Sequence, residues 1–236
     1  MNSTILRALL LGLFTATFTF TGLHAQTRAY VANELSATVS VIDTATNTVV
    51  ATIPVGGSPD GIVASPDGSR VYVSNFNDGT VSVIDTAANS VVSTIHVGGA
   101  PAHLTISPDG TTIYVPNEFG NNITLIDTNS NTVVGSITVG FGPFSVSVTP
   151  DGTRAYTGNF FEGTISVIDT STNTVAATIF ATTFPTLMHV TPDGAQLDVT
   201  DEFLNSVTVI DTATNAVVAT IPIGGEEVFG LAPTKD

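Results

Sequence analysis

The side chains that could do chemistry in this 236-residue sequence are few and strongly acidic. There are 20 Asp and Glu against 5 Lys and Arg, with four His and no Cys. The absence of Cys excludes disulfides, thiolate chemistry and Cys-ligated zinc. A net charge near −15 argues against nucleic acid as a partner, because that affinity comes largely from cations that neutralise phosphates. Carboxylates, imidazoles and aromatic rings remain as candidate functional groups.

Two histidines are candidates for a general base or a metal ligand. His103 and His189 both lie in segments predicted to be the innermost strands of two different sequence repeats. They occupy different positions in their repeats, so nothing forces them to converge, and a packed or hydrogen-bonded histidine is the default. No nucleophile elbow, phosphate-binding glycine loop or zinc motif is present. The sequence therefore predicts no catalytic set, no metal and no cofactor.

Carboxylates gather near the C-terminal end of the sequence. Asp198, Asp201, Glu202, Glu226 and Glu227 all fall in its last fifth. Oxygen-rich clusters suit Ca²⁺ or a basic partner. No Asp-x-Asp-x-Asp-Gly loop accompanies them, so their spacing does not predict a calcium site.

A unit of 42 residues repeats through most of the chain. Ile-Asp-Thr recurs with its Asp at 43, 85, 127, 169 and 211, and Pro-Asp-Gly recurs with its Asp at 67, 109, 151 and 193. Self-similarity at this period indicates a repeat architecture. The repeats are bounded at about 28–68, 69–110, 111–152, 153–194 and 195–236.

Each repeat predicts four short strands. Residues 69–110 hold four runs rich in β-branched residues with alternating polarity, separated by turn residues such as Pro108-Asp109-Gly110. No stretch of ten residues has helical spacing. Four antiparallel strands in about 42 residues are typical of a β-propeller blade. The predicted fold is thus an all-β propeller of five four-stranded blades.

The repeat resembles the YVTN β-propeller family. The motif stands at Tyr30-Val-Ala-Asn33, Tyr72-Val-Ser-Asn75, Tyr114-Val-Pro-Asn117 and Tyr156-Thr-Gly-Asn159. The resemblance implies a secreted or surface-layer-type propeller, and relatives include seven-bladed lactonase-type and lyase-type enzymes. The fifth copy departs from the motif with Asp198-Val-Thr-Asp201, and five repeats are fewer than the seven blades more usual among relatives.

The two ends of the repeat array predict ring closure. The array opens on the second strand of a blade, Arg28 to Asn33, and ends on a segment, 229–233, that resembles an innermost strand. We expect this C-terminal strand to pair with the N-terminal blade and complete it. An open ring would expose about ten aliphatic side chains worth roughly 1.5–3 kcal/mol each, more than a typical net stability.

Residues 1–25 predict a signal peptide. Arg7 precedes an apolar run at 8–20, which is shorter than the roughly 20 residues of a membrane span, and Ala25 is a small residue at the exit. We expect cleavage there and a single propeller domain at 26–236. The protein would be exported to a periplasmic, extracellular or cell-surface location, with no membrane span after cleavage, and we expect a monomer.

The candidate functional surface is the face that carries the loops between the second and third strands and between blades. These loops vary between repeats, whereas the turns at the opposite end are repetitive. The candidate binding residues there are Asp60, Phe76, Glu118, Phe119, Phe160, Phe161, Glu162, Asp201, Glu202, Phe203, Glu226 and Glu227. Variation concentrated on one face of a regular scaffold suggests binding, although acids could serve solubility alone.

Two functions remain open from the sequence. The first is a non-catalytic binding module whose acidic, Phe-rich face takes a protein, a peptide or a cell-surface component. The alternative is a lactonase-like hydrolase or lyase that uses His103 or His189 with acids such as Asp60 at the channel mouth.

Overall fold

The computed structural model describes residues 27–224, 228 and 231. The predicted signal peptide and the candidate residues Glu226 and Glu227 lie outside these residues, as does the predicted closing strand at 229–233 apart from Leu231, which is not part of a strand. Within the described part the only helix is a single 3-10 turn, η1 (Glu34–Ser36). No helix in this part is both long and apolar enough to cross a membrane.

Nineteen strands make up the described structure. Their bounds are β1 Arg28–Asn33, β2 Thr38–Asp43, β3 Thr48–Pro54, β4 Pro59–Ala64, β5 Arg70–Asn75, β6 Thr80–Asp85, β7 Ser90–His96, β8 Thr105–Ile106, β9 Thr112–Asn117, β10 Asn122–Asp127, β11 Thr132–Thr138, β12 Pro143–Val148, β13 Arg154–Asn159, β14 Thr164–Asp169, β15 Thr174–Phe180, β16 Pro185–Val190, β17 Gln196–Asp201, β18 Ser206–Asp211 and β19 Ala216–Pro222.

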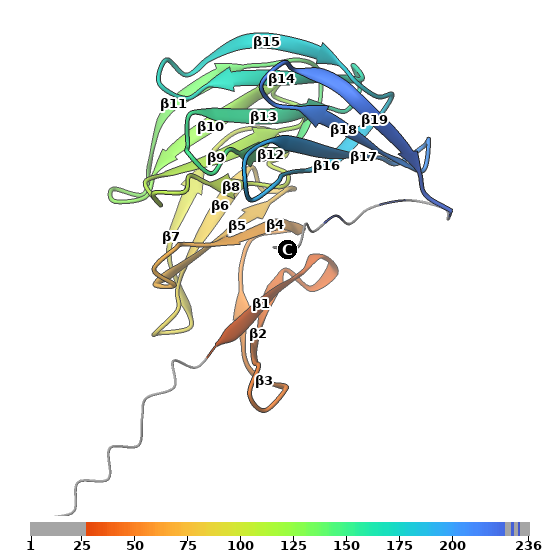
Figure 1. The fold of residues 1–236 in the computed structure, drawn as a ribbon. Helices are drawn as coiled ribbons and strands as arrows, with labels where there is room; N and C mark the ends of the chain where they lie inside the picture. Colours follow the sequence, from red (N-terminus) through yellow and green to blue (C-terminus); the bar gives the residue numbers. More distant parts are fainter. Residues whose placement is uncertain (1–26, 225–227, 229–230, 232–236) are drawn as a thin grey trace, which may run out of the picture.

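These strands form five antiparallel sheets in chain order, which confirms the all-β prediction. The first sheet, β1-β2-β3, has three strands, and the others, β4 to β7, β8 to β11, β12 to β15 and β16 to β19, have four each. Figure 1 shows the sheets standing one after another along a curved arc. The innermost strands β4, β8, β12 and β16 are neighbours along the inside of the arc, and the outermost strands β3, β7, β11 and β15 along its outside.

The turns form where the sequence supplies residues for a left-handed backbone. Asn89 lies between β6 and β7 with φ of 49°, a conformation that Asn tolerates better than most residues. The preceding Asp85 accepts hydrogen bonds from the backbone N–H groups of Ala87 and Ala88 at 2.9 and 2.8 Å. Asp67 likewise closes a Pro-Asp-Gly turn, where hydrogen bonds from Ser65 and Ser69 lower its pKa to about 2. These turns are structural, as predicted.

The hydrophobic core lies between neighbouring sheets rather than in one centre. Alternate side chains of each strand point to opposite faces of its sheet, so each sheet packs on the sheet before it and the sheet after it. Between the second and third sheets, for example, Tyr72, Val81 and Val83 pack against Ile113 and Ile126, all of them buried. Each repeat therefore depends on its neighbours for stability.

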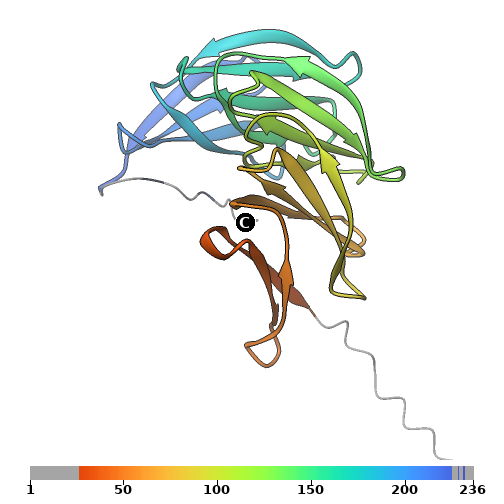
Figure 2. The same ribbon diagram turned by 180° about the vertical axis from the view of Figure 1, so that it is seen from behind.

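The first and fifth sheets stand at the two ends of the arc, as both views show (Figures 1 and 2). Among the described residues, none of the extensive strand-to-strand packing joins these two sheets. Of the segment predicted to close the ring, the structure describes Leu231 alone, outside any strand, so closure stays a prediction.

Replacing a residue at the sheet interfaces should cost far more stability than replacing an outer-strand residue. Ile126→Ala removes a fully buried side chain and should lower the free energy of unfolding by about 2–5 kcal/mol. Val134→Ala, at a position that is 61% exposed on β11, should change it by less than about 0.5 kcal/mol. Urea unfolding followed by circular dichroism measures both. Equal losses in the two variants would contradict a core built from sheet interfaces.

Candidate functional site

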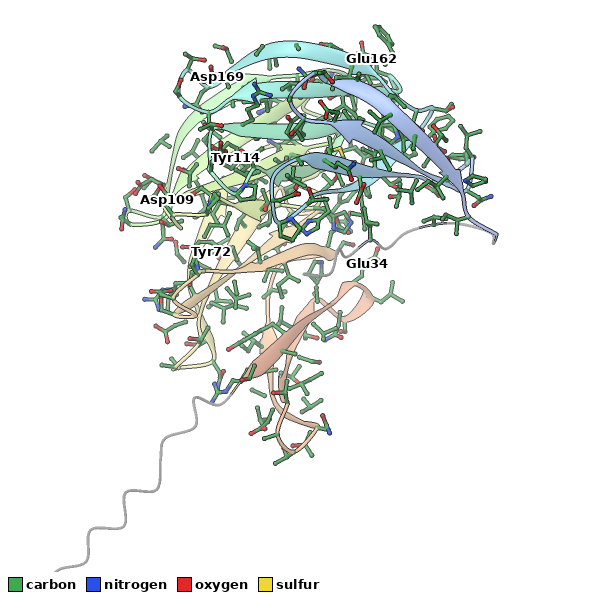
Figure 3. All side chains as sticks on the ribbon, in the orientation of Figure 1. Glu34, Tyr72, Asp109, Tyr114, Glu162 and Asp169 are labelled. Atoms are coloured by element: carbon green, nitrogen blue, oxygen red, sulfur yellow. The ribbon has the colours of Figure 1, made fainter. Side chains whose placement is uncertain are left out.

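One face of the arc carries two sets of connections that are hydrogen-bonded together. We call this face the loop face: it comprises the turns that follow β1, β5, β9, β13 and β17, and the links that lead from β3, β7, β11 and β15 into the next sheet. Equivalent backbone bonds tie the two sets, such as Phe76 N–H to the Ser58 carbonyl at 2.9 Å and Phe160 N–H to the Gly142 carbonyl at 2.7 Å. Figure 3 shows Glu34 and Glu162 along this edge, and Asp109 and Asp169 at the opposite edge.

Phenylalanines from three sheets form a continuous aromatic row on the loop face. Phe141 contacts Phe161 with ring centroids 5.0 Å apart, and Phe161 contacts Phe160 at 5.1 Å. The row continues from Phe160 to Phe184 at 5.3 Å and from Phe184 to Phe203 at 4.4 Å. Phe141, Phe161 and Phe203 are about half exposed, at 52%, 45% and 63%. Side chains of this kind normally lie inside a protein, so the row is an exposed apolar surface that the local packing holds in place.

A second aromatic pair adjoins the other end of the loop face. Phe76 and Phe119 meet edge to face at 5.9 Å, and Phe119 is exposed. Glu118 precedes Phe119, and its backbone N–H donates to the Ala100 carbonyl at 3.0 Å. The structure thus places the predicted residues Phe76, Glu118 and Phe119 together at one junction of two sheets.

Asp60 on β4 forms a pair with His103, which lies just before β8 in an isolated bridge with Ser145 and not on the inner strand that the sequence predicted for it. Asp60 Oδ1 lies 3.7 Å from His103 Nε2, and each side chain is about one third exposed. The imidazole also meets the Phe144 ring edge to face at 5.0 Å, and the His103 backbone N–H donates to the Phe144 carbonyl at 3.0 Å. Asp60 Oδ2 is buried with no hydrogen-bond partner. The sequence analysis offered Asp60 as an acid that could act with His103 or His189, and in the structure it lies beside His103.

Gly61 allows β4 and the segment that leads into β8 to approach closely enough for that pair. A Cβ added at Gly61 would lie 2.8 Å from the Ala102 carbonyl oxygen and from His103 Cα, which is closer than real Cβ contacts. Sequence reasoning missed this residue. The available signal was a lone glycine in an inner strand, since the equivalent positions in the next repeats are His103, Ser145 and Leu187, and a glycine inside a strand often marks close backbone approach.

The electrostatics around Asp60 disfavour its ionised form. Burial raises the pKa of Asp60, the His103 charge lowers it, and the Glu34 carboxylate raises it again. The pKa of Glu118 is also raised, first by burial and then by the nearby Asp60. Carboxyl groups from three sheets therefore lie near one imidazole, with Asp60 and Glu118 partly buried and Glu34 exposed.

Asp201 supports the loops from beneath and does not lie on the surface. It is fully buried and accepts hydrogen bonds from the Thr182 hydroxyl and from four backbone N–H groups, those of Thr183, Phe184, Phe203 and Leu204. Burial opposes its ionisation, but these bonds outweigh burial and lower its pKa. The equivalent Asn159 instead donates to Thr164 and Ser166. Asp201 is thus a capping residue for two loops that hold the aromatic row.

The remaining acidic candidates occupy separate places. Glu162 accepts a hydrogen bond from the Phe141 backbone N–H at 3.1 Å through Oε2, and Glu202 is half-buried in the turn after β17. Glu226 and Glu227 lie outside the described residues. Among the side chains that the structure describes, no group of three or more His, Cys, Asp or Glu could hold a metal ion.

His103 and His189 have different surroundings. His189 is exposed on β16 and stands opposite Asp198 in the β16–β17 ladder. Burial raises the pKa of Asp198 and the charge of His189 lowers it. His103 instead contacts Asp60 and Phe144, so the two imidazoles serve separate pairs.

Four-stranded antiparallel sheets of this order, set side by side along an arc, define the protein class as a β-propeller. The chain belongs to the family described as "Lactonase, 7-bladed beta-propeller", which matches residues 18–138. The family description gives seven blades, whereas the described residues form five sheets.

A solved structure supports the same fold. A chain from "Kuenenia stuttgartiensis Hydrazine Synthase" is 26% identical, with a TM-score of 0.75 over 86% of this chain and 69% of that chain. No curated protein matches the sequence.

Single substitutions around Asp60 should move its pKa in opposite directions. His103→Gln removes a charge that favours the carboxylate and should raise the pKa of Asp60, whereas Glu34→Gln removes a repulsive charge and should lower it. A pH titration of the carboxyl carbon by NMR measures both shifts. His96→Gln, an exposed histidine at the end of β7, serves as the control and should leave the pKa unchanged. Shifts of the same sign in both variants would contradict the geometry.

Proposed function

We propose that the protein is a binding module whose loop face takes a ligand that is both cationic and apolar, such as a basic amphipathic segment of another protein. The observation that carries this proposal is the exposed row from Phe141 to Phe203 with carboxylates on the same face. Exposed apolar surface rimmed by polar groups is typical of interaction sites. Aromatic rings beside carboxylates favour a cation, because both the ring faces and the carboxylates attract positive charge.

The distribution of charge favours binding over hydrolysis. The arginines of the described residues, Arg28, Arg70 and Arg154, begin strands at the end away from the loop face and bond to carbonyls or to Asp85. Cleavage of an ester or lactone develops negative charge on oxygen, which needs a nearby donor or cation. Near His103 the charged neighbours are instead the carboxyl groups of Asp60, Glu34 and Glu118. That setting suits a cation better than an oxyanion.

The scaffold that we propose for this face is an exported, monomeric ring of five YVTN-type blades. Residues 1–25 would direct export to a periplasmic, extracellular or cell-surface location. The segment 229–233 would pair with β1, whose inner edge in the three-stranded first sheet has no strand paired with it among the described residues. Pairing there would give the first sheet the same four strands as the others.

A second candidate function is hydrolysis, supported by the family and by the Asp60–His103 pair. In this reading Asp60 Oδ1 orients the imidazole through Nε2, and Nδ1 takes a proton from an attacking water. Lactones are the substrate class that the family description suggests, and aryl esters are hydrolysed by the same kind of attack on a carbonyl carbon.

Neutralising the acids of the loop face should weaken binding to a basic amphipathic probe. Glu34→Gln, Glu118→Gln and Glu202→Gln together should lower affinity for an immobilised Lys- and Leu-containing amphipathic peptide about tenfold or more. The matched control is Thr52→Lys, Thr94→Lys and Thr178→Lys, at exposed positions of β3, β7 and β15, which changes the net charge equally. If both triple variants lost affinity for the peptide equally, binding would depend on net charge alone, and the proposal of a localised site would be wrong.

Phe161→Ala with Phe203→Ala tests the apolar part of the same site, with Val134→Ala and Val218→Ala as exposed outer-strand controls. Affinity for the amphipathic peptide should fall in the double phenylalanine variant and stay unchanged in the double valine variant.

The hydrolase candidate makes a separate prediction. If it holds, the purified protein turns over a member of a lactone and aryl-ester panel, and His103→Gln lowers kcat at least about 100-fold, the usual size of general-base catalysis. His96→Gln should retain full activity. Activity that survives in His103→Gln would eliminate this base.

A further inference from the structure

The edge opposite the loop face carries a hollow at each junction of two successive sheets. Figure 3 shows Tyr72, Tyr114 and Asp109 toward this edge. Each hollow is lined by the tyrosine of the repeat motif in one sheet and by turns of the next sheet. The junctions therefore offer similar spaces, and the polar groups inside them decide which one can hold a ligand.

Between the second and third sheets the tyrosine hydroxyl finds its partner within the protein. Tyr72 Oη lies 3.5 Å from Asn131 Oδ1, a long hydrogen bond across the junction. Arg70 stays on its own sheet, where it forms an ion pair with Asp85 at 2.6 Å. This junction is complete without a ligand.

Between the fourth and fifth sheets the counterparts of that tyrosine and asparagine are both left unpartnered. Tyr156 is fully buried, and neither its Oη nor the buried Asn215 Oδ1 has a hydrogen-bond partner among the described residues. Arg154 crosses this junction instead, and its Nη1 donates to the Thr212 carbonyl at 2.6 Å. Because an unpaired buried hydroxyl or carbonyl is costly, this pair points to a molecule from outside the chain.

The other two junctions in the described part of the chain lack such a pair. Tyr30 Oη is also buried and unpartnered, but Asn89 Oδ1 opposite it accepts a hydrogen bond from Arg28 Nη1 at 3.1 Å. Asn173, opposite Tyr114, is exposed. The unpartnered donor and acceptor thus meet only at the junction of the fourth and fifth sheets.

The two unpartnered groups line adjoining hollows of suitable size. Tyr156 lines a hollow of about 310 Å³ and Asn215 lines one of about 560 Å³. Both hollows are also lined by Asp151, Thr153 and Arg154. Pockets for small ligands typically have volumes of about 300–1,000 Å³, so the space suits a small molecule.

The charged groups around the hollow leave both acceptors and donors free. Asp193 accepts hydrogen bonds from Thr191 and Ala195 through Oδ1, and its Oδ2 remains available as an acceptor. Arg154 has five N–H donors, and its bond to Thr212 uses one of them.

This mixture of groups favours a neutral ligand with several hydroxyls. The carboxylates of Asp151 and Asp193 disfavour an anion, and the guanidinium of Arg154 disfavours a metal cation. Pro150 and Ala213 add apolar surface to the lining, against which the C–H groups of a sugar ring can pack.

We propose that the junction of the fourth and fifth sheets is a second binding site, which takes a sugar through a hydroxyl that bridges Tyr156 Oη and Asn215 Oδ1. A hydroxyl both accepts and donates, so a single one satisfies the tyrosine donor and the amide acceptor. The site lies at the edge opposite the loop face. It depends neither on ring closure nor on the ligand of the loop face.

The four tyrosines of the chain report on this site directly, because each lies at a different junction. Protein labelled with ¹³C-tyrosine gives separate ring signals in NMR spectra, and single Tyr→Phe variants assign them. Glucose, galactose, mannose and N-acetylglucosamine are the probes. At least one of them should shift the Tyr156 signals saturably at millimolar concentration and leave the Tyr72 signals in place. Betaine, which has no hydroxyl, should move neither.

Asn215→Ala should lower the affinity for that sugar about tenfold or more, because it removes the acceptor of a buried hydrogen bond. Asn131→Ala is the matched control at the junction that needs no ligand, and it should leave the affinity unchanged. Undisturbed Tyr30 and Tyr114 signals show that each variant is folded.

Two results would overturn the proposal. If no sugar moves the Tyr156 signals, the hollow takes water alone. If the sugar moves them equally in Asn215→Ala and in the unaltered protein, the bridge does not exist. Where a sugar binds, its methyl glycoside distinguishes two sources of the ligand: equal binding indicates the end of a glycan, and loss of binding indicates a free monosaccharide.

Discussion

Burial of apolar side chains between successive sheets is the interaction on which the rest of the structure depends. Each strand alternates its side chains between two faces, so no sheet can bury both faces alone, and each sheet needs a neighbour on either side. Inside the arc this requirement is met with side chains such as Val83 and Ile126 that are fully buried. The loops that carry Glu118 and the phenylalanines of the aromatic row hold their positions because the sheets beneath them are fixed by these interfaces, and Asp60 is held on strand β4 itself.

The fold was predictable because it repeats. An Asp at 43 and at every 42nd residue after it marks the same turn five times, and Asn89 and its counterparts adopt the left-handed conformation that those turns need. The order of strands within a sheet follows from that period. The geometry of ring closure does not follow from the period. It depends on the angle between neighbouring sheets, and that angle is set by small differences in side-chain volume that the period does not specify.

The candidate site was predictable in part. Loop position alone placed Phe160, Phe161 and Phe203 on one face, and the structure joins them into one row through Phe184. Loop position could not show that Asp201 is buried, since a carboxylate at an asparagine position can either reach solvent or accept backbone hydrogen bonds. The close approach of Asp60 to His103 depends on Gly61, a contact between two repeats that only the three-dimensional packing reveals.

Contacts limited to adjacent repeats have a consequence for how such a chain changes over generations. Because the extensive strand packing of the described residues joins successive sheets, gain or loss of a whole 42-residue unit can leave the kind of contact between the remaining sheets unchanged. The number of repeats can therefore change by duplication or deletion of gene segments without the need for a differently packed core. The near-identity of residues 39–56 and 207–224 fits a history in which entire units were copied, and diversification then concentrated on the loops.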